Sequence, residues 1–288
     1  MATLYLLAHP QLLLHPDRLL DPDTETRKQI DRMCAFLGNA EGRDKIGKLV
    51  QFIARFLDGF FREGPGLSLI AAETSLPYCN QLRCLWNGLQ TARCWAWMGK
   101  SLIEWKTDIQ TFESKQMVPE VKVLHMTARF FFAVRWFFEN FMLLVKEKVL
   151  LPSAKGGYLP LPEAAVLNKY AKKFWFYAIF TAVCCEVAKL RILKNKYDEI
   201  ENKVISTVAT GNDKQKSQQL VEEQKVKKEE ELAKLKSDAK LRLRTIFTNV
   251  MDSPASISVG FGYSMSHMTV GGLMSIASYL QCQNLYPK

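Results

Sequence analysis

Residues 121–149 read VKVLHMTARFFFAVRWFFENFMLLVKEKV, and this stretch says more about the fold class than any other part of the chain. At 100° per residue, its polar side chains gather in an arc of about 140° around Arg129. The other polar members of this arc are Lys122, His125, Arg135, Glu139, Asn140, Lys146 and Glu147. The apolar arc opposite holds Phe130, Phe131, Val134, Phe137, Phe138, Phe141, Met142, Leu144 and Val145. The pattern predicts a long amphipathic α-helix.

This helix has more than one interpretation. Charged residues recur every few positions, which disfavours a simple membrane span. A helix that lies against a membrane, or that packs on other helices, agrees better with the two-sided pattern. The core of a soluble helical bundle stays open as an alternative.

A second amphipathic helix is predicted upstream, where residues 43–63 read RDKIGKLVQFIARFLDGFFRE. Its apolar stripe has helical spacing and consists of Ile46, Leu49, Val50, Ile53, Phe56, Leu57, Phe60 and Phe61. Its basic residues lie on the remaining faces and are Arg43, Lys45, Lys48, Arg55 and Arg62. We expect the Gly-Pro-Gly sequence at 64–66 to end this helix.

Residues 82–103 predict a third helix, with a weaker moment and three tryptophans beside Arg and Lys. That composition suits the interface between a bilayer and water. We therefore take the basic and aromatic residues of 43–63 and 82–103 as candidate lipid contacts. They are Arg43, Lys45, Lys48, Arg55, Phe56, Phe60, Arg83, Trp86, Arg93, Trp95, Trp97 and Lys100.

Near the C-terminus, residues 253–287 contain no Asp, Glu, Lys or Arg over 35 positions. The central part, 257–280, is 24 residues long and could span a bilayer as one helix. Small residues recur there every fourth position, a spacing that lets helices approach closely in lipid. These candidate packing residues are Ser258, Gly262, Ser266, Gly271 and Ser275. A buried core helix or a Gly/Ser-rich loop is the alternative.

Two further segments are less decisive. Residues 174–190 carry only 12 consecutive uncharged positions, which is short for a span and typical of an interfacial, re-entrant or core segment. Residues 206–244 are rich in Gln, Lys and Glu, and we expect a solvated, partly helical linker there. The apolar series there is too sparse to predict a coiled coil and consists of Leu220, Leu232, Leu235 and Ala239.

No strand-like alternation persists, so the predicted fold is all-α: a bundle of amphipathic, membrane-associated helices with a C-terminal hydrophobic membrane anchor. We expect four segments along the chain. They are an N-terminal arm (1–28), an amphipathic and hydrophobic helical region (29–205), a charged linker (206–245) and a C-terminal membrane segment (246–288).

Composition argues against an enzyme. The four His are scattered, and the seven Cys show no Cys-x-x-Cys spacing, so we expect no metal, cofactor or catalytic residue. Residues 42–48 imitate a phosphate-binding loop, but Leu49 replaces the Ser or Thr that would hold magnesium. Glu104 and Asp108 share a helix face, and we expect a solvated surface pair.

The net charge of +10 favours an anionic partner. The basic residues form no compact Arg-rich block and instead flank aromatic-rich helices. Acidic phospholipid is therefore favoured over nucleic acid as the partner.

Three stretches together resemble the peroxin-eleven family of peroxisomal membrane-elongation proteins. Residues 42–45 (GRDK), with Leu49, Gln51-Phe52 and 54–57 (ARFL), resemble its N-terminal signature. Residues 89–102 (LQTARCWAWMGKSL) look like its second motif, and 271–280 (GGLMSIASYL) are similar to its terminal hydrophobic segment. The order and position of all three agree with the family.

The resemblance implies a non-enzymatic protein of the peroxisomal (or glycosomal) membrane. Such a protein inserts amphipathic helices into the cytosolic leaflet, elongates the organelle before division, and self-associates. Its implied partners are anionic phospholipid, further copies of itself and the organelle-division machinery. A pore for small metabolites is the alternative, with Arg129, Arg135 and Glu139 as lining residues if 121–149 crosses the bilayer. A soluble nucleic-acid-binding bundle is a third reading.

Overall fold

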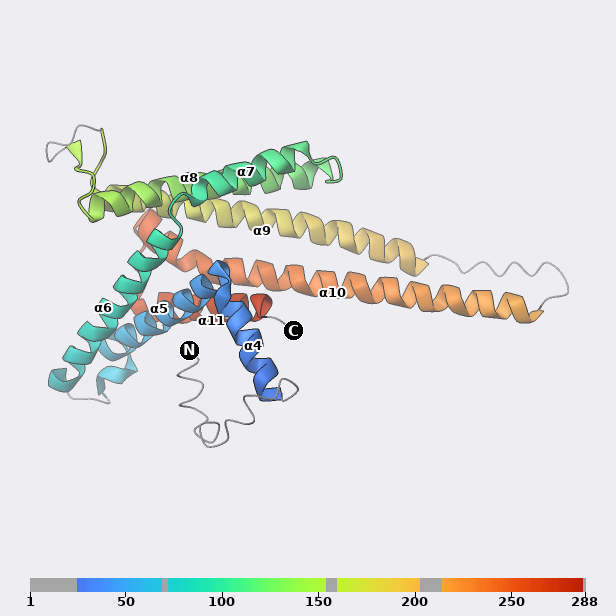
Figure 1. Ribbon diagram of the computed structural model, residues 1–288, viewed down its shortest axis with the longest axis horizontal. Helices are drawn as coiled ribbons and strands as arrows, with labels where there is room; N and C mark the ends of the chain where they lie inside the picture. The colour runs from blue at the N-terminus through green and yellow to red at the C-terminus, as the bar shows by residue number, and fades with distance from the viewer. Residues whose placement is uncertain (1–24, 69–71, 154–159, 203–213, 287–288) are drawn as a thin grey trace. The chain divides into compact units, whose positions relative to one another are not determined.

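The computed structural model describes residues 25–68, 72–153, 160–202 and 214–286, and within these ranges the regular elements are all helical (Figure 1). The expected all-α class is therefore confirmed. The chain forms two compact units. One unit contains Met1–Ala96 with Met265–Lys288, and the other contains Trp97–Ser264. We call them the N/C unit and the middle unit.

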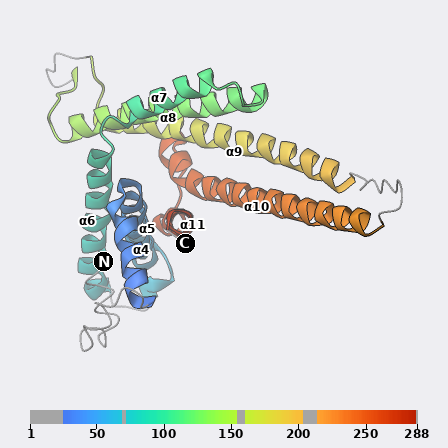
Figure 2. The same cartoon turned by 45° about the vertical axis from the view of Figure 1, so that its right-hand side comes forward.

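The N/C unit is built around α5 (Ala40–Glu63), the amphipathic helix predicted over 43–63. Asn39 caps its N-terminus, where the side chain accepts a hydrogen bond from the backbone N–H of Glu41. The other helices of this unit are α4 (Glu25–Gly38), the 3₁₀ turn η1 (Pro65–Ser68), α6 (Ala72–Ala96) and α11 (His267–Leu285). α5 packs against both α6 and α11 (Figure 2). Its buried side chains include the polar residues Asp44, Gln51 and Asp58, whereas Val50 and Ile53 of the predicted apolar stripe are 40% and 42% exposed.

The middle unit consists of α7 (Lys100–Glu113), α8 (Pro119–Lys146), α9 (Ala164–Asn202) and α10 (Lys214–Phe261). α8 is the helix predicted over 121–149, and Pro119 lies in its first turn, where no intrahelical N–H bond is lost. α8 packs on α7 and α9, and α9 runs beside α10 (Figure 1). The segment 174–190 is thus the middle of one 39-residue helix, α9.

The single helix predicted over 82–103 is wrong. α6 ends at Ala96, and Gly99 takes a left-handed conformation with φ of 79° before α7 begins at Lys100. Glycine adopts this conformation without steric cost, so helical spacing can continue in the sequence through a real turn. The unit boundary lies beside this turn. Trp97 and Lys100 therefore belong to the middle unit, whereas Trp86, Arg93 and Trp95 belong to the N/C unit.

The continuous helix predicted over 257–280 is also wrong. α10 ends at Phe261, Gly262 has φ of 78°, and Ser266 caps α11 by accepting a hydrogen bond from Thr269 N–H. Ser258, Gly262 and Ser266 therefore do not form one helix face. None of the helices in the described ranges is long and apolar enough to cross a membrane. The expected C-terminal anchor is not confirmed.

The charged segment 206–245 is helical from Lys214 onward, where it forms the first part of α10 rather than a separate linker. α10 continues without interruption into 246–261 and packs along α9. Residues 206–213, and the part of the N-terminal arm before Glu25, lie outside the described residues.

Candidate membrane-binding surface

Helix α7 has reversed polarity compared with a helix on a soluble protein. Its buried residues are Glu104, Asp108 and Thr111, which all face protein. Leu102 and Ile109 are 73% and 59% exposed on its outer side, together with Ile103, Trp105 and Phe112. Soluble helices bury the apolar stripe instead, so this arrangement marks an interaction surface.

The buried polar face of α7 meets the polar face of α8. Arg129 Nη1 donates a 2.8 Å hydrogen bond to Glu104 Oε2, and His125 Nδ1 lies 3.4 Å from Thr111 Oγ1. Asp108 Oδ1 accepts no hydrogen bond from the described residues. Burial raises the pKa of the Asp108 carboxyl, and burial followed by repulsion from Arg129 lowers the pKa of His125. The expectation that Glu104 and Asp108 are solvated is therefore wrong.

The same arrangement recurs between α8 and α9. Glu139 is buried and forms ion pairs with Arg135, at 3.2 Å, and with Lys172, at 3.3 Å. The Arg135 guanidinium lies 4.3 Å from the ring centroids of both Trp136 and Trp175. Aromatic faces and one carboxylate thus stabilise two cations inside the helix interface.

A third ion pair joins α9 to α10, where Arg242 Nη1 donates a 2.9 Å hydrogen bond to Glu186 Oε2. Each of the three adjacent helix pairs of the middle unit is thus joined by a carboxylate and a cation on opposite helices. Charged groups in the interfaces and apolar groups outside are the arrangement that a lipid-facing helical protein requires.

The outer surface of the middle unit carries a continuous row of aromatic rings, which we call the aromatic band. Ring centroids lie 5.6 Å apart for Trp105 and Phe130, 5.7 Å for Phe130 and Phe131, and 5.7 Å for Phe131 and Tyr177. Phe261 of α10 continues the row, 6.2 Å from Tyr177. Four members are about two-fifths exposed: Trp105, Phe130, Tyr177 and Phe261. The band therefore connects α7, α8, α9 and the end of α10 across one surface.

Most basic candidates of the N/C unit make contacts inside the protein. Lys48 is buried, with Nζ 3.2 Å from Gln281 Oε1, and Arg93 donates to Asp44 and Gln51. Arg83 pairs with the buried Asp58, and Arg55 donates to His267 Nδ1. Arg43 donates to the carbonyls of Leu37 and Gly38, and Lys45 is half-buried.

The aromatic candidates divide between the two units. In the N/C unit Trp86 stacks near His267 and Arg55, while Trp95 is 44% exposed. Phe56 and Phe60 stack on each other, half-buried. In the middle unit, Lys100 Nζ lies 3.9 Å from the Trp97 ring centroid. Trp95 is thus the most exposed of the aromatic candidates.

Two of the predicted anchor-packing residues have a different role. A Cβ atom on Gly271 would lie 2.4 Å from the backbone N of Phe56, so α11 and α5 touch at backbone distance there. Ser275 donates its hydroxyl to the carbonyl of Gly271 within α11. Small residues in this segment therefore allow close helix packing inside the N/C unit.

The aromatic band and the outer face of α7 were not among the predicted site residues. Leu102, Trp105, Ile109 and Phe112 follow helical spacing, so a signal was present in the sequence. The helix predicted over 82–103 runs through the turn at Gly99, so the sequence pattern does not assign a separate helix face to 104–113.

Comparison with known proteins identifies the family. A family profile described as "Peroxisomal biogenesis factor 11 (PEX11)" matches residues 30–286, nearly the whole chain, and the chain belongs to this family. The resemblance seen in the sequence motifs is therefore confirmed. No curated protein and no solved structure matches the chain. Members are peroxisome biogenesis factors rather than enzymes, so the protein acts at the peroxisome, in elongation and division of its membrane.

The buried Asp108 carboxyl predicts a specific dependence of stability on pH. The pKa of this carboxyl is raised in the folded protein, so the protonated form contributes to stability. That contribution is complete below the unfolded-state pKa of about 3.8 and is lost as pH rises through the pKa of the folded state. We expect Asp108→Asn to remove this loss and to increase stability near neutral pH. Denaturant unfolding of both proteins across a pH series checks this. The prediction would be contradicted if the free energy of unfolding changed with pH in the same way in wild type and variant.

Proposed function

We propose that this protein curves and elongates the peroxisomal membrane by embedding the aromatic band and the outer face of α7 in one leaflet. The observation that carries the proposal is the reversed polarity of α7, with Glu104 and Asp108 inside and Leu102, Ile109 and Phe112 outside. An amphipathic helix of this kind lies in the interface plane, with its apolar face about 5–10 Å deep.

Energetics support a strong interaction with lipid. Each large side chain that moves from water into lipid contributes about 1.5–3 kcal/mol when burial is complete. Two of the buried carboxylates that would oppose insertion are already paired in the helix interfaces, Glu104 with Arg129 and Glu139 with Lys172. Insertion of the outer face therefore requires no buried charge to lose its partner.

Basic residues near the band supply the electrostatic part. Lys106 is exposed on α7 beside Trp105, and Lys173 Nζ lies 5.9 Å from the Phe261 ring centroid. A basic residue near an anionic membrane surface contributes about 1 kcal/mol. Anionic phospholipid is therefore the proposed partner, together with further copies of this chain and the organelle-division machinery. Apolar side chains inserted into one leaflet expand it relative to the other and so favour curvature. Self-association would raise the local density of inserted helices.

The pore alternative has less support. Two of its candidate lining residues form ion pairs between helices, Arg129 with Glu104 of α7 and Glu139 with Lys172 of α9. The third, Arg135, pairs with Glu139 within α8. Contacts of this kind stabilise the helix packing, which supports the proposal of membrane insertion over that of a pore.

Liposome flotation of the full-length protein tests the proposal. We expect Ile109→Glu to reduce binding to anionic vesicles about tenfold or more, because a loss of about 1.5–3 kcal/mol corresponds to that factor or above. Leu76→Glu is the matched control, since Leu76 is 54% exposed on α6 in the other unit. Equal binding by wild type and Ile109→Glu, or loss of binding only with Leu76→Glu, would refute the assignment to α7.

A further inference from the structure

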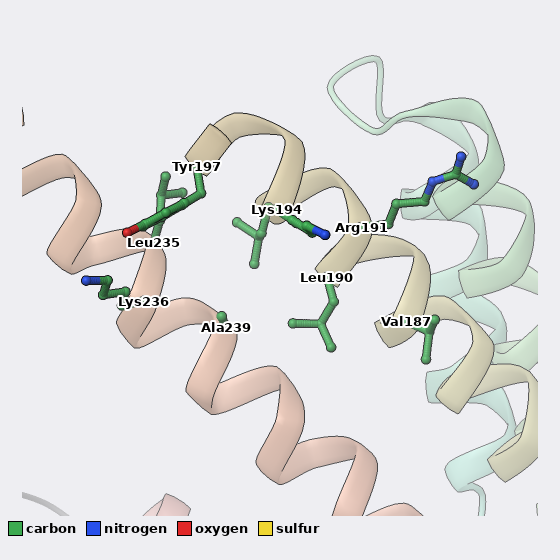
Figure 3. A pocket seen from close by; sticks show the side chains of 9 residues that line it. Val187, Leu190, Arg191, Lys194, Tyr197, Leu235, Lys236 and Ala239 are labelled. Carbon is green, nitrogen blue, oxygen red and sulfur yellow. The ribbon is translucent and has the colours of Figure 1, made fainter. Parts of the chain in front are cut away.

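The first half of α10 has two opposite faces. Its inner face meets α9, because Leu235 and Ala239 line a shallow groove together with Leu190 and Tyr197 of that helix (Figure 3). On the opposite side of the helix, the side chains of 222–236 are exposed. α9 therefore covers one side of this segment and leaves the other side open.

The open side, which we call the outer face, has the heptad spacing of a helix that pairs with another helix. Glu223, Val226, Glu230 and Ala233 follow one another at intervals of three and four residues, and all are exposed. Further exposed charges flank this seam on both sides: Glu222, Lys225, Lys227, Glu229, Lys234 and Lys236. At 100° per residue, Lys228 and Glu231 lie nearer to the α9 side. The outer face thus carries four carboxylates and four ammonium groups around two apolar side chains.

This balance of charge decides which partner fits the outer face. An anionic lipid surface, a nucleic acid and a peptide of one charge sign would each meet four like charges there. A complementary partner instead carries both signs in the reverse order. The outer face is itself such a surface when its helix is turned end to end. Charge complementarity therefore favours a second copy of this chain.

An antiparallel pair of outer faces, centred near residue 228, places opposite charges together. The facing residues of the two copies are Glu222 and Lys236, Glu223 and Lys234, Lys225 and Glu229, and Lys227 and Glu230. Two-fold symmetry repeats each of these contacts, and Val226 and Ala233 lie along the centre. A parallel pair in register would place Glu223 and Glu230 against their own copies, so like charges disfavour it.

We propose that the outer face of α10 binds the same face of a second copy of this chain, with the two helices antiparallel. The proposal rests on the proposed function in one respect: it names the surface for the self-association which that function includes. Exposed ion pairs are individually weak, and the seam has little apolar area. The pairing is therefore reversible in dilute solution and becomes extensive where many copies are held on one membrane.

Sedimentation velocity of the full-length protein in a mild non-ionic detergent, over a series of concentrations, tests the proposal. We expect wild type to self-associate at low ionic strength and to dissociate in about 1 M salt, where charges are screened within about 3 Å. Lys225→Glu/Lys227→Glu/Lys234→Glu makes the outer face wholly acidic except at Lys236, and we expect at least tenfold weaker association. The matched control is Lys115→Glu/Lys169→Glu/Lys196→Glu, which changes the net charge equally at exposed residues away from this face. Absence of wild-type association, or equal association of both triple variants, overturns the proposal.

A mixing experiment tests the pairing itself. Glu223→Lys/Glu229→Lys/Glu230→Lys makes the face basic except at Glu222, and we expect this variant alone to associate as weakly as the acidic one. An equimolar mixture of the two is expected to regain association, because each face then meets its opposite. No recovery in the mixture, with both variants folded by circular dichroism, overturns the pairing.

The two proposals fail separately. Ile109→Glu, which weakens vesicle binding under the proposed function, is expected to leave self-association in detergent unchanged. Loss of self-association in Ile109→Glu would instead place the contact between copies on α7 and overturn its assignment to α10. Flotation that fails for wild type, while the charge variants still behave as expected, would contradict membrane insertion alone.

Discussion

Glu139→Ala is expected to lower the free energy of unfolding of the middle unit by about 3–5 kcal/mol. The Glu139 carboxylate is 4% exposed and forms ion pairs with both Arg135 and Lys172. Lys172 is itself buried, so removal of the carboxylate leaves desolvated cations without their counter-charge. The cost of leaving buried cations without a counter-charge exceeds the effect of the four deleted heavy atoms.

Denaturant unfolding measured by tryptophan fluorescence checks this expectation, since Trp136 and Trp175 flank the Arg135 guanidinium. Glu139→Gln keeps the side-chain volume and isolates the effect of charge, and we expect a loss in the same direction. Lys146→Ala is the control, because its pair with Glu147 is half-exposed and is worth about 0–1 kcal/mol. If Glu139→Ala lies within 1 kcal/mol of Lys146→Ala, the buried pair does not hold α8 to α9.

Gly59→Ala is expected to detach α11 from α5. A Cβ atom on Gly59 would lie 2.2 Å from the backbone N of Met268, and backbone atoms cannot move aside as a flexible side chain can. Overpacking of this kind costs about 1–3 kcal/mol or more. Gly271→Ala meets the same obstacle from the other helix, at Phe56. Both variants should therefore behave alike.

Hydrogen exchange of α11 amides measures the effect, and we expect their protection to fall in both variants. Gly88→Ala is the matched control on α6, where the new methyl group meets nothing within 4 Å. Replacing an unconstrained helical glycine by alanine should stabilise by about 0.5–1 kcal/mol. Unchanged protection of α11 in Gly59→Ala would show that the two helices do not meet at these glycines.

The helices that could be predicted are those whose signal is local. α5 and α8 follow from the spacing of apolar residues along 43–63 and 121–149, because one turn of helix sets that spacing without any partner. The helix breaks at Gly99 and Gly262 could not be predicted this way. A glycine is compatible with a helix and with a left-handed turn, and packing elsewhere selects between them.

The candidate lipid contacts predicted from the sequence lie on 43–63 and 82–103, whereas the surface proposed from the structure lies on α7 and the aromatic band. A basic, aromatic-rich helical protein follows from composition, but which apolar side chains stay exposed, such as Leu102 and Ile109 of α7, depends on how the helices pack. Glu104 and Asp108 were expected in solvent, because the position of Arg129, 25 residues from Glu104, is invisible to a local pattern.

By itself, the sequence determined the all-α class, the two clearest amphipathic helices and, through three motifs, the family. These features depend on spacing within a few turns of one helix. Only the tertiary structure decided which faces are covered, since that depends on distant partners such as Glu139 with Lys172 and Gly59 with Met268. An apolar stripe has the same spacing whether it meets α11 or lipid, so only the partner that packs against it determines its role.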